Sequence, residues 1–356
     1  MSQLFSSFKL RELVFRNRVF VSPMCQYSSE NGMPTDWHLV HLGSRAVGGA
    51  GLVMVEATGV SPIGRISPGD SGIWSDAHAE AFKRITKFIK GTGAVPAIQI
   101  AHAGRKGSTD APWRGGKKLG LNEGGWEPWG PSAVPFDETY PMPRAMTLAD
   151  INQVAGEFEA AAVRALNAGF EVIEVHAAHG YLLHEFLSPM SNRRTDQYGG
   201  SLENRMRLTL RIAEIVRKTW PVKWPVFVRI SATDWVEGGW DLPQSIELAK
   251  ALKKLGIDLI DCSSGGNVPK APIPIGPGYQ VPLSEAIRRD AGIATGAVGL
   301  ITDATQAEQI IAEGKADVVL LARAFLADAY WPIHAAETLN AEIDWPVQYG
   351  RAKKKK

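Results

Sequence analysis

The stretch VIEVHAAHGY, residues 172–181, contains the signal that decides the fold. An apolar alternation that starts at Phe170 predicts a buried strand, and it ends at His176. Two imidazoles and a phenol, those of His176, His179 and Tyr181, then lie within six residues. In parallel α/β folds the chemistry takes place at the carboxyl ends of the strands. Imidazoles can donate hydrogen bonds to a substrate oxygen and a phenol can supply a proton, so the stretch favours an enzyme.

Strand-like and helix-like segments alternate along the whole chain. Hydrophobic patterns predict strands over residues 18–21, 52–55, 97–100, 172–175, 226–230, 259–261, 294–297 and 318–321. Amphipathic periodicity predicts helices over 77–90, 148–167, 202–219, 245–255 and 305–313, with glycine or proline near their ends. Eight strands alternating with helices predict a (β/α)8 TIM barrel rather than an open sheet. No Gly-x-Gly-x-x-Gly follows the first strand, which argues against a dinucleotide-binding open sheet.

A long insertion, residues 104–144, follows the third predicted strand and is rich in Gly, Pro and Trp. Loops of this length inside a compact domain are usually functional, so we expect an active-site loop. The sequence shows no linker and no repeat beyond the strand–helix alternation. We therefore expect one barrel domain over residues 1–356.

Composition excludes several classes of protein. The chain has 39 basic and 37 acidic residues, a net charge of +2, so we expect no nucleic-acid partner. Cys25 and Cys262 are the only cysteines, which argues against a disulfide framework and favours the cytoplasm. The first residues lack a signal-peptide pattern, and no apolar run is long enough to span a membrane. The charge run Lys353–Lys356 is expected to be a solvated tail.

Nearly every predicted strand ends in polar or unusual residues. These ends hold Pro23–Tyr27, Glu56–Ala57, Gln99 and His102, His176, Arg229, Val298–Gly299 and Ala322–Arg323. In a barrel they would converge on one mouth, which favours a site. Barrels often bind phosphate with the loops after strands seven and eight. Gly299 permits close backbone approach and Arg323 can grip phosphate oxygens, so these two residues predict a phosphate site.

Several stretches carry a specific family resemblance. They are residues 16–18, 23–27, 49–52, 98–106 and 176–201. Along nearly its whole length the chain resembles the old yellow enzyme family of FMN-dependent ene-reductases. Cys25, with the His-x-x-His spacing of His176 and His179, resembles the bacterial branch that includes thermophilic-type enzymes and xenobiotic reductases.

This resemblance implies a role for each matching residue. Pro23, Met24, Cys25, Ala57 and Gln99 would pack on or hydrogen-bond the flavin ring, and Arg229 would face its N1/C2 edge. Val298, Gly299, Ala322 and Arg323 would hold the FMN phosphate end. His176 and His179 would bind the substrate's oxygen, Tyr181 would deliver the proton, and Tyr27 would form part of the substrate wall. Cys25 would either tune the flavin potential or only pack, and the sequence does not separate the two.

The resemblance also implies the reaction. NADPH would reduce FMN, and an electron-poor alkene would then take hydride from flavin N5 and a proton from Tyr181. Enones, maleimides, nitroalkenes, quinones and nitrate esters all present a suitable acceptor. The physiological substrate and the preference for NADPH over NADH stay open.

The carboxyl terminus, residues 344–356, is short and aromatic and contains Arg351. The branch that the chain resembles uses a similar arginine across a dimer interface. We therefore expect a homodimer or homotetramer in which Arg351 reaches the substrate site of the neighbouring protomer.

Two alternative functions are a metal-dependent barrel hydrolase and a non-catalytic flavin carrier. A metal-dependent barrel hydrolase would use His102, His176 and His179 as ligands, although His-x-x-His alone is weak evidence for a metal. A non-catalytic flavin carrier would have no need of Tyr181 beside a histidine pair.

Overall fold

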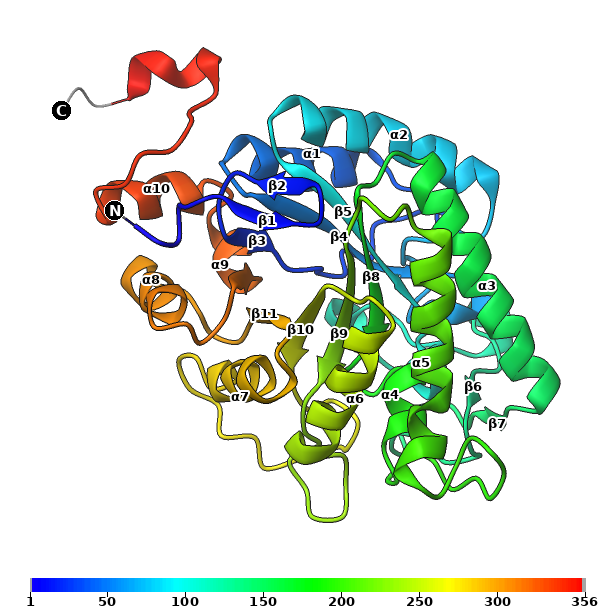
Figure 1. Cartoon of the computed structure of the whole chain (residues 1–356). Coiled ribbons are helices and arrows are strands. Elements are labelled where there is room, and N and C mark those ends of the chain that lie inside the picture. The colour runs from blue at the N-terminus through cyan, green and yellow to red at the C-terminus, as the bar shows by residue number, and fades with distance from the viewer. Residues whose placement is uncertain (1, 354–356) are drawn as a thin grey trace.

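Eight parallel strands close into a barrel in the computed structural model, which describes residues 2–353 (Figure 1). The strands are β3 (Val19–Val21), β4 (Leu52–Gly59), β5 (Val95–Ala101), β8 (Val172–Ala177), β9 (Val226–Ser231), β10 (Leu259–Ser263), β11 (Ala294–Ala297) and β12 (Val318–Leu321). Each strand pairs with the next one along the chain, and β12 pairs with β3 to close the barrel. The TIM-barrel prediction is confirmed, and all eight predicted strands form.

Helices lie around the outside of this barrel (Figure 1). They are α1 (Asp36–Val47), α2 (Asp76–Gly91), α3 (Leu148–Asn167), α4 (Leu182–Leu187), α5 (Leu202–Thr219), α6 (Leu242–Lys254), α7 (Val281–Ala291), α8 (Ala304–Ala312), α9 (Arg323–Ala327) and α10 (Trp331–Thr338). The five predicted helices all form. The largest difference is in α6, which begins at Leu242 rather than Ser245. It begins earlier because Asp241 caps it through the N–H of Gln244 and a proline occupies its first turn.

The barrel interior is apolar at its amino-terminal end. The side chains that pack there come from alternate positions of the strands, such as Phe20, Val172 and Phe227. A short antiparallel hairpin, β1 (Phe8–Leu10) and β2 (Leu13–Phe15), adds Phe15 to this cluster. The hairpin therefore closes this end, so that a site can open only at the opposite end.

Strand β4 contains an irregularity near its carboxyl end. Val55 pairs with Ile98, but Ala57 pairs with Gln99, so one residue, Glu56, is extra on β4. Bulges of this kind re-aim side chains and are common beside active sites. Here the bulge brings Ala57 level with Gln99.

The insertion after β5 folds into short pieces rather than long elements. It contains the 3₁₀ turns Gly104–Lys106, Pro112–Arg114 and Leu121–Glu123, and the strand pair β6 (Trp129–Gly130) and β7 (Arg144–Ala145). A further 3₁₀ turn, Pro62–Gly64, follows β4. The last element, Val347–Ala352, stands away from the barrel (Figure 1). Among residues 2–353, no helix has both the length and the apolar character that a membrane crossing requires.

Candidate active site

His176 lies at the carboxyl end of β8, level with Arg229 of β9. Its ring is buried, and its Nδ1 accepts a hydrogen bond from the backbone N–H of Ala178 at 3.1 Å. Burial, and then the nearby Arg229 cation, hold the pKa of His176 well below its usual range. A neutral imidazole that accepts at Nδ1 carries its proton on Nε2. His176 therefore presents an Nε2–H donor, which has no partner within residues 2–353.

His179 follows in a turn with left-handed backbone (φ +60°), a conformation that is uncommon for residues other than glycine. Its backbone N–H donates to Ser231 Oγ at 2.9 Å, and its Nε2 lies 2.7 Å from Ser263 Oγ. Those serines face each other at the ends of β9 and β10. Burial first, then Arg229, hold the pKa of His179 well below its usual range. The two neighbouring strands thus orient a second neutral imidazole.

Three rings meet at this end of the barrel. The centroid of His176 lies 5.1 Å from that of His179 and 4.9 Å from that of Tyr181, and both pairs meet edge to face. Burial raises the pKa of Tyr181 well above its usual range, so the phenol keeps its proton at neutral pH. The structure places together the three side chains to which the sequence analysis assigned substrate binding and proton transfer.

A polar layer lies beneath the rings inside the barrel. Gln99 Nε2 donates to Glu174 Oε1 at 2.8 Å, and Arg229 Nε lies 3.2 Å from Asp261 Oδ2. Burial and the neighbouring Asp261 raise the pKa of Glu174 well above its usual range. Burial also raises the pKa of Asp261 to about 6, although Arg229 opposes the shift. The Arg229 cation is thus held within a cluster of buried acids.

Glu174 and Asp261 were not predicted from the sequence as site residues. The signal was available, because each is a single charged residue within an otherwise apolar strand. A buried carboxyl group needs a partner, and a barrel supplies one from the next strand.

The segment that follows β3 forms one wall of the mouth, and its residues Pro23–Tyr27 are half-buried. Burial, Asp70 and Glu56 together raise the pKa of Cys25 well above its usual range, so its side chain is a thiol rather than a thiolate. The ring of Tyr27 meets Trp113 of the insertion edge to face, with centroids 5.4 Å apart. The insertion therefore contributes to this wall.

A small cavity of about 170 Å³ lies beyond the ends of β11 and β12. Val298, Gly299, Ala322 and Arg323 all line it, as do Ser263 and Gln280. Gly299 has a φ of +114°, and a Cβ there would lie 2.6 Å from Gln280 Nε2. The Arg323 side chain is exposed and has no partner within residues 2–353. The structure thus brings the four predicted phosphate residues to one concave site.

Lys106 is a further residue to which the sequence analysis assigned no role. Its Nζ donates to the backbone oxygens of His179 at 2.9 Å and Gly266 at 3.0 Å, and it lies 5.4 Å from the centroid of Tyr181. Burial lowers the pKa of Lys106 to about 8. Lys106 therefore ties the His179 turn to the loop after β10. No local pattern marks such a contact, since its partners are backbone atoms far away in the sequence.

The hydrolase alternative finds no support. Within residues 2–353, no three His, Cys, Asp or Glu side chains are placed to hold a metal ion. His102 Nδ1 accepts from the backbone N–H of Gly104 at 3.1 Å, and its ring stacks on Trp129 with centroids 6.4 Å apart. Burial lowers the pKa of His102 to about 4. His102 is engaged by its own loop rather than aimed at the histidine pair.

Arg351 lies away from the cluster of the three rings. It belongs to the exposed turn Val347–Ala352 and lines a cavity of about 930 Å³ with Ile333 and Ala336 of α10. Figure 1 shows that this segment projects from the α10 side of the barrel. Arg351 is thus not joined to the ring cluster of its own chain, and its role in a neighbouring protomer stays a prediction.

Comparisons with known proteins agree with this geometry. Residues 3–342 match the model of a family described as NADH:flavin oxidoreductase / NADH oxidase. The chain is 50% identical to an NADPH dehydrogenase of Halalkalibacterium halodurans over 352 residues, 98% of each chain. Morphinone reductase has a similar structure, with a TM-score of 0.80 and 28% identity over 97% of this chain and 91% of that one. A 2-naphthoyl-CoA reductase superposes with a TM-score of 0.85 and 29% identity over 94% of this chain, which spans only 52% of that larger chain.

Proposed function

The chain belongs to the NADH:flavin oxidoreductase / NADH oxidase family, and we propose that it reduces electron-poor carbon–carbon double bonds. It is an FMN-dependent NADPH dehydrogenase of the old yellow enzyme type, as the sequence predicted. The chemistry that bound FMN would supply here is hydride transfer between NADPH and an acceptor. The proposed acceptors are enones, maleimides and nitroalkenes, with quinones and nitrate esters as further candidates.

The cavity after β11 and β12 fits the phosphate end of FMN. A phosphate needs N–H donors and a cation, and Gly299 allows the backbone to approach while Arg323 supplies an exposed guanidinium. Ala322 has a negative φ of −111°, so this position does not need the left-handed backbone that favours glycine. We assign Val298, Gly299, Ala322 and Arg323 to this end.

The inner end of the mouth fits the flavin ring. Arg229 lies 3.2 Å from the buried Asp261, a position from which its guanidinium would stabilise the anionic reduced ring. Ala57 and Gln99 lie level with each other across the bulge, and Pro23, Met24 and Cys25 form the adjoining half-buried wall. We assign these residues to contacts with the ring.

The observation that carries the proposed function is the neutral histidine pair beside a protonated phenol. His176 offers a fixed Nε2–H, and the serines on β9 and β10 orient His179. Donors held in place before the reaction stabilise negative charge that develops on a carbonyl or nitro oxygen. Tyr181 keeps its proton, and its ring centroid lies 4.9 Å from that of His176; we propose that it protonates the α carbon.

Anaerobic turnover with NADPH tests this function. We expect the holoenzyme to reduce cyclohexenone, N-phenylmaleimide and a nitroalkene. Hydride from the cofactor should appear at the β carbon, and solvent deuterium at the α carbon. Oxidation of NADPH by quinone or dioxygen with no reduction of any of the three alkenes would contradict the proposal.

Cys25 should influence the flavin, because a half-buried thiol in the ring wall contributes a polarizable neutral group. Cys25→Ser should retain FMN and shift its reduction potential measurably, with altered rates of flavin reoxidation. Potentiometry with a dye of known potential measures this shift. Cys262→Ser is the matched control, since Cys262 is buried on β10 and bonds to its own strand through Ile260 O. An unchanged reduction potential in Cys25→Ser would indicate that Cys25 only packs.

We further propose that the C-terminal segment, residues 344–353, docks on a second copy of the chain. The segment has no buried core: Val347 is 89% exposed and Tyr349 is 40% exposed. It borders a cavity of about 760 Å³ that Arg84 and Phe88 of α2 also line. Exposed apolar groups of this kind are stabilised by docking, and a symmetric dimer would make the exchange reciprocal. Arg351 could then offer its planar donor fork to the neighbouring substrate site.

Two truncations test whether the C-terminal segment docks on a second copy of the chain. Removal of residues 345–356 should weaken association and activity together, because the second protomer loses both a contact and Arg351. Removal of residues 353–356 should change little and serves as the control, although Lys354–Lys356 lie outside the described residues. Sedimentation velocity and turnover measure both effects. A truncated protein that stays fully active as a monomer would contradict the shared site.

The cytoplasmic location stays a prediction. It rests on Cys25 and Cys262, which are both unpaired.

A further inference from the structure

Gly180 joins His179 to Tyr181, and its backbone N–H has an unusual acceptor. The N–H donates to Nδ1 of His184 at 3.0 Å. Gly180 has a φ of +72°, and a Cβ at this position would overlap the backbone of Gly266 and lie 2.8 Å from Asn267 Cα. The peptide is thus buried against the loop after β10, where an unpaired N–H would be costly. The acceptor on His184 is therefore needed to keep this turn in place.

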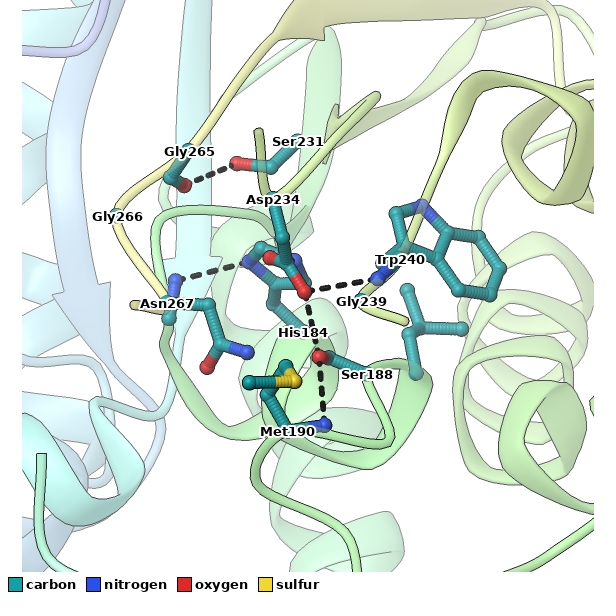
Figure 2. A network of polar contacts seen from close by, with 12 residues as sticks. His184, Ser188, Met190, Ser231, Asp234, Gly239, Trp240, Gly265, Gly266 and Asn267 are labelled. Atoms are coloured by element: carbon teal, nitrogen blue, oxygen red, sulfur yellow. Dashed lines mark hydrogen bonds and ion pairs between the residues drawn. The ribbon is translucent and has the colours of Figure 1, made fainter. Parts of the chain in front are cut away.

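His184 in turn faces Asp234. His184 lies on α4, Asp234 lies in the loop after β9, and both side chains are fully buried. His184 Nε2 is 3.0 Å from Asp234 Oδ1, while Asp234 Oδ2 accepts from Ser188 Oγ at 2.5 Å and from the backbone N–H of Trp240 at 2.9 Å. Figure 2 shows Asp234 at the centre of these groups.

Asp234 is an anion in this setting. Burial alone would raise its pKa, but the nearby His184, the Ser188 hydroxyl and the Trp240 N–H outweigh burial and lower the pKa. A carboxylate has only acceptors, so it favours a proton on the nitrogen that faces it, His184 Nε2. With its proton on Nε2, the neutral His184 ring has an unprotonated Nδ1. That nitrogen can accept a hydrogen bond, which is the form that the Gly180 N–H requires.

The remaining groups of the turn are held by other partners. Ser231 Oγ accepts from His179 N, Ala178 O accepts from Tyr181 N, and Lys106 Nζ donates to His179 O. Within the described part of the chain, residues 2–353, His184 is thus the one side chain that bonds to the Gly180 N–H. Without it, the His179–Gly180 peptide would lose the bond at its N–H and keep the bond from Lys106 at its carbonyl.

We propose that Asp234 and His184 act as a positioning pair for the reaction. Asp234 holds the His184 tautomer, and His184 holds the Gly180 peptide, so that His179 and Tyr181 keep their places beside the substrate. Neither residue touches the ring cluster through a bond of its own. The structural part of this inference stands on the contacts above, while its effect on alkene reduction rests on the proposed function.

Two substitutions of His184 separate its two nitrogens. In His184→Asn, the amide oxygen can take the place of Nδ1 and accept from Gly180, but the side chain is too short to reach Asp234. In His184→Gln, the amide can take the place of Nε2 beside Asp234, but the acceptor for Gly180 is lost. The two variants therefore have similar polarity and opposite expected effects on the turn at Gly180.

Asp234→Asn tests whether Asp234 determines the tautomer of His184. Trp240 N–H and His184 Nε2–H both need an acceptor, and an asparagine has only one oxygen. If that oxygen accepts from Trp240, the NH₂ group faces His184 and favours a proton on Nδ1. Two donors, Nδ1–H and the Gly180 N–H, would then face each other.

The experiment uses the FMN-loaded proteins. We expect ¹⁵N NMR of wild-type His184 to show the Nε2–H tautomer, and Asp234→Asn to shift it toward Nδ1–H. Hydrogen exchange at the Gly180 amide should speed up at least about tenfold in His184→Gln and Asp234→Asn, and stay near the wild-type rate in His184→Asn. Reoxidation of reduced flavin by cyclohexenone should slow on the order of tenfold in the first two variants, the cost of one lost orienting hydrogen bond. His184→Asn should recover most of that loss.

Ser245→Ala is the control for a merely structural effect. Ser245 Oγ is bonded to Trp240 Nε1 and Ala232 O beside the same loop, but it has no link to Gly180. This variant should lower the melting temperature without changing exchange at Gly180.

Three results would overturn the proposal. They are an Nδ1–H tautomer in the wild type, equal exchange at Gly180 in His184→Asn and His184→Gln, and faster exchange at Gly180 in Ser245→Ala. The wild-type spectrum and the two His184 variants decide the question even if Asp234→Asn does not fold. A wild-type protein that reduces no alkene would overturn the proposed function instead. The tautomer and the exchange rates would still test whether Asp234 and His184 position the turn.

Discussion

His176→Ala should leave the protein folded and yellow while alkene reduction falls on the order of 10²-fold or more, the usual cost of one lost oxyanion donor. The reason is the fixed Nε2–H of a neutral ring, whose other nitrogen is engaged by Ala178 N–H. The flavin contacts that we propose come from other strands, so FMN content should be unchanged. Flavin reduction by NADPH should suffer less than alkene reduction. Stopped-flow absorbance separates the two half-reactions.

A pH series adds a second check on His176. Burial holds the pKa of the ring well below its ordinary value of about 6.5. The donor should therefore keep one protonation state between roughly pH 6 and 8, and alkene reduction by the wild type should show no step from this histidine. Loss of bound flavin in His176→Ala, or an equal loss in both half-reactions, would contradict the assignment. A strong step near pH 6.5 that His176→Ala abolishes would contradict the neutral state.

Tyr181→Phe should slow cyclohexenone reduction substantially, because it removes a proton source beside the α carbon. General acid catalysis of this kind typically contributes about 10²–10⁴-fold. Quinone reduction needs no protonation at carbon and should stay near the wild-type rate. Turnover rates with cyclohexenone and with a quinone, measured on one enzyme preparation, give the difference.

Tyr198→Phe is the matched control for Tyr181→Phe. The Tyr198 hydroxyl accepts from Arg211 at 3.2 Å and its ring packs on Phe186, so both acceptors should react at the wild-type rate in this variant. A uniform drop for enone and quinone in Tyr181→Phe would instead indicate that the phenol only packs.

The location of the candidate site followed from the order of residue types along the chain. Each of Gln99, His176 and Arg229 lies near the carboxyl end of an apolar strand, and parallel strands bring their carboxyl ends to one rim. The phosphate residues were found in the same way, from Gly299 and Arg323 after the last two strands. Glu174 and Asp261 were missed although the sequence showed them, because a lone charge in a strand does not say which neighbour compensates it.

The positioning contacts were not accessible from the sequence. Lys106 reaches the backbone of His179, and Asp234 reaches His184 across a loop, yet both lie in polar segments with many possible partners. The acceptor roles of His176 and His184 were equally hidden, because they depend on individual backbone N–H groups. Such contacts appear only when loops from different strands are placed together.

The sequence by itself determined the barrel, since a period of two in the strands and about 3.6 in the helices is a local property of the chain. It also determined which chemical groups stand at the rim. Tertiary structure alone decided the state of those groups: the neutral His176 with its proton on Nε2, the left-handed turn at His179, and the bulge that sets Ala57 level with Gln99. The physical reason is that protonation, tautomer and rotamer respond to burial and to partners from distant strands. Those partners meet only when the barrel closes.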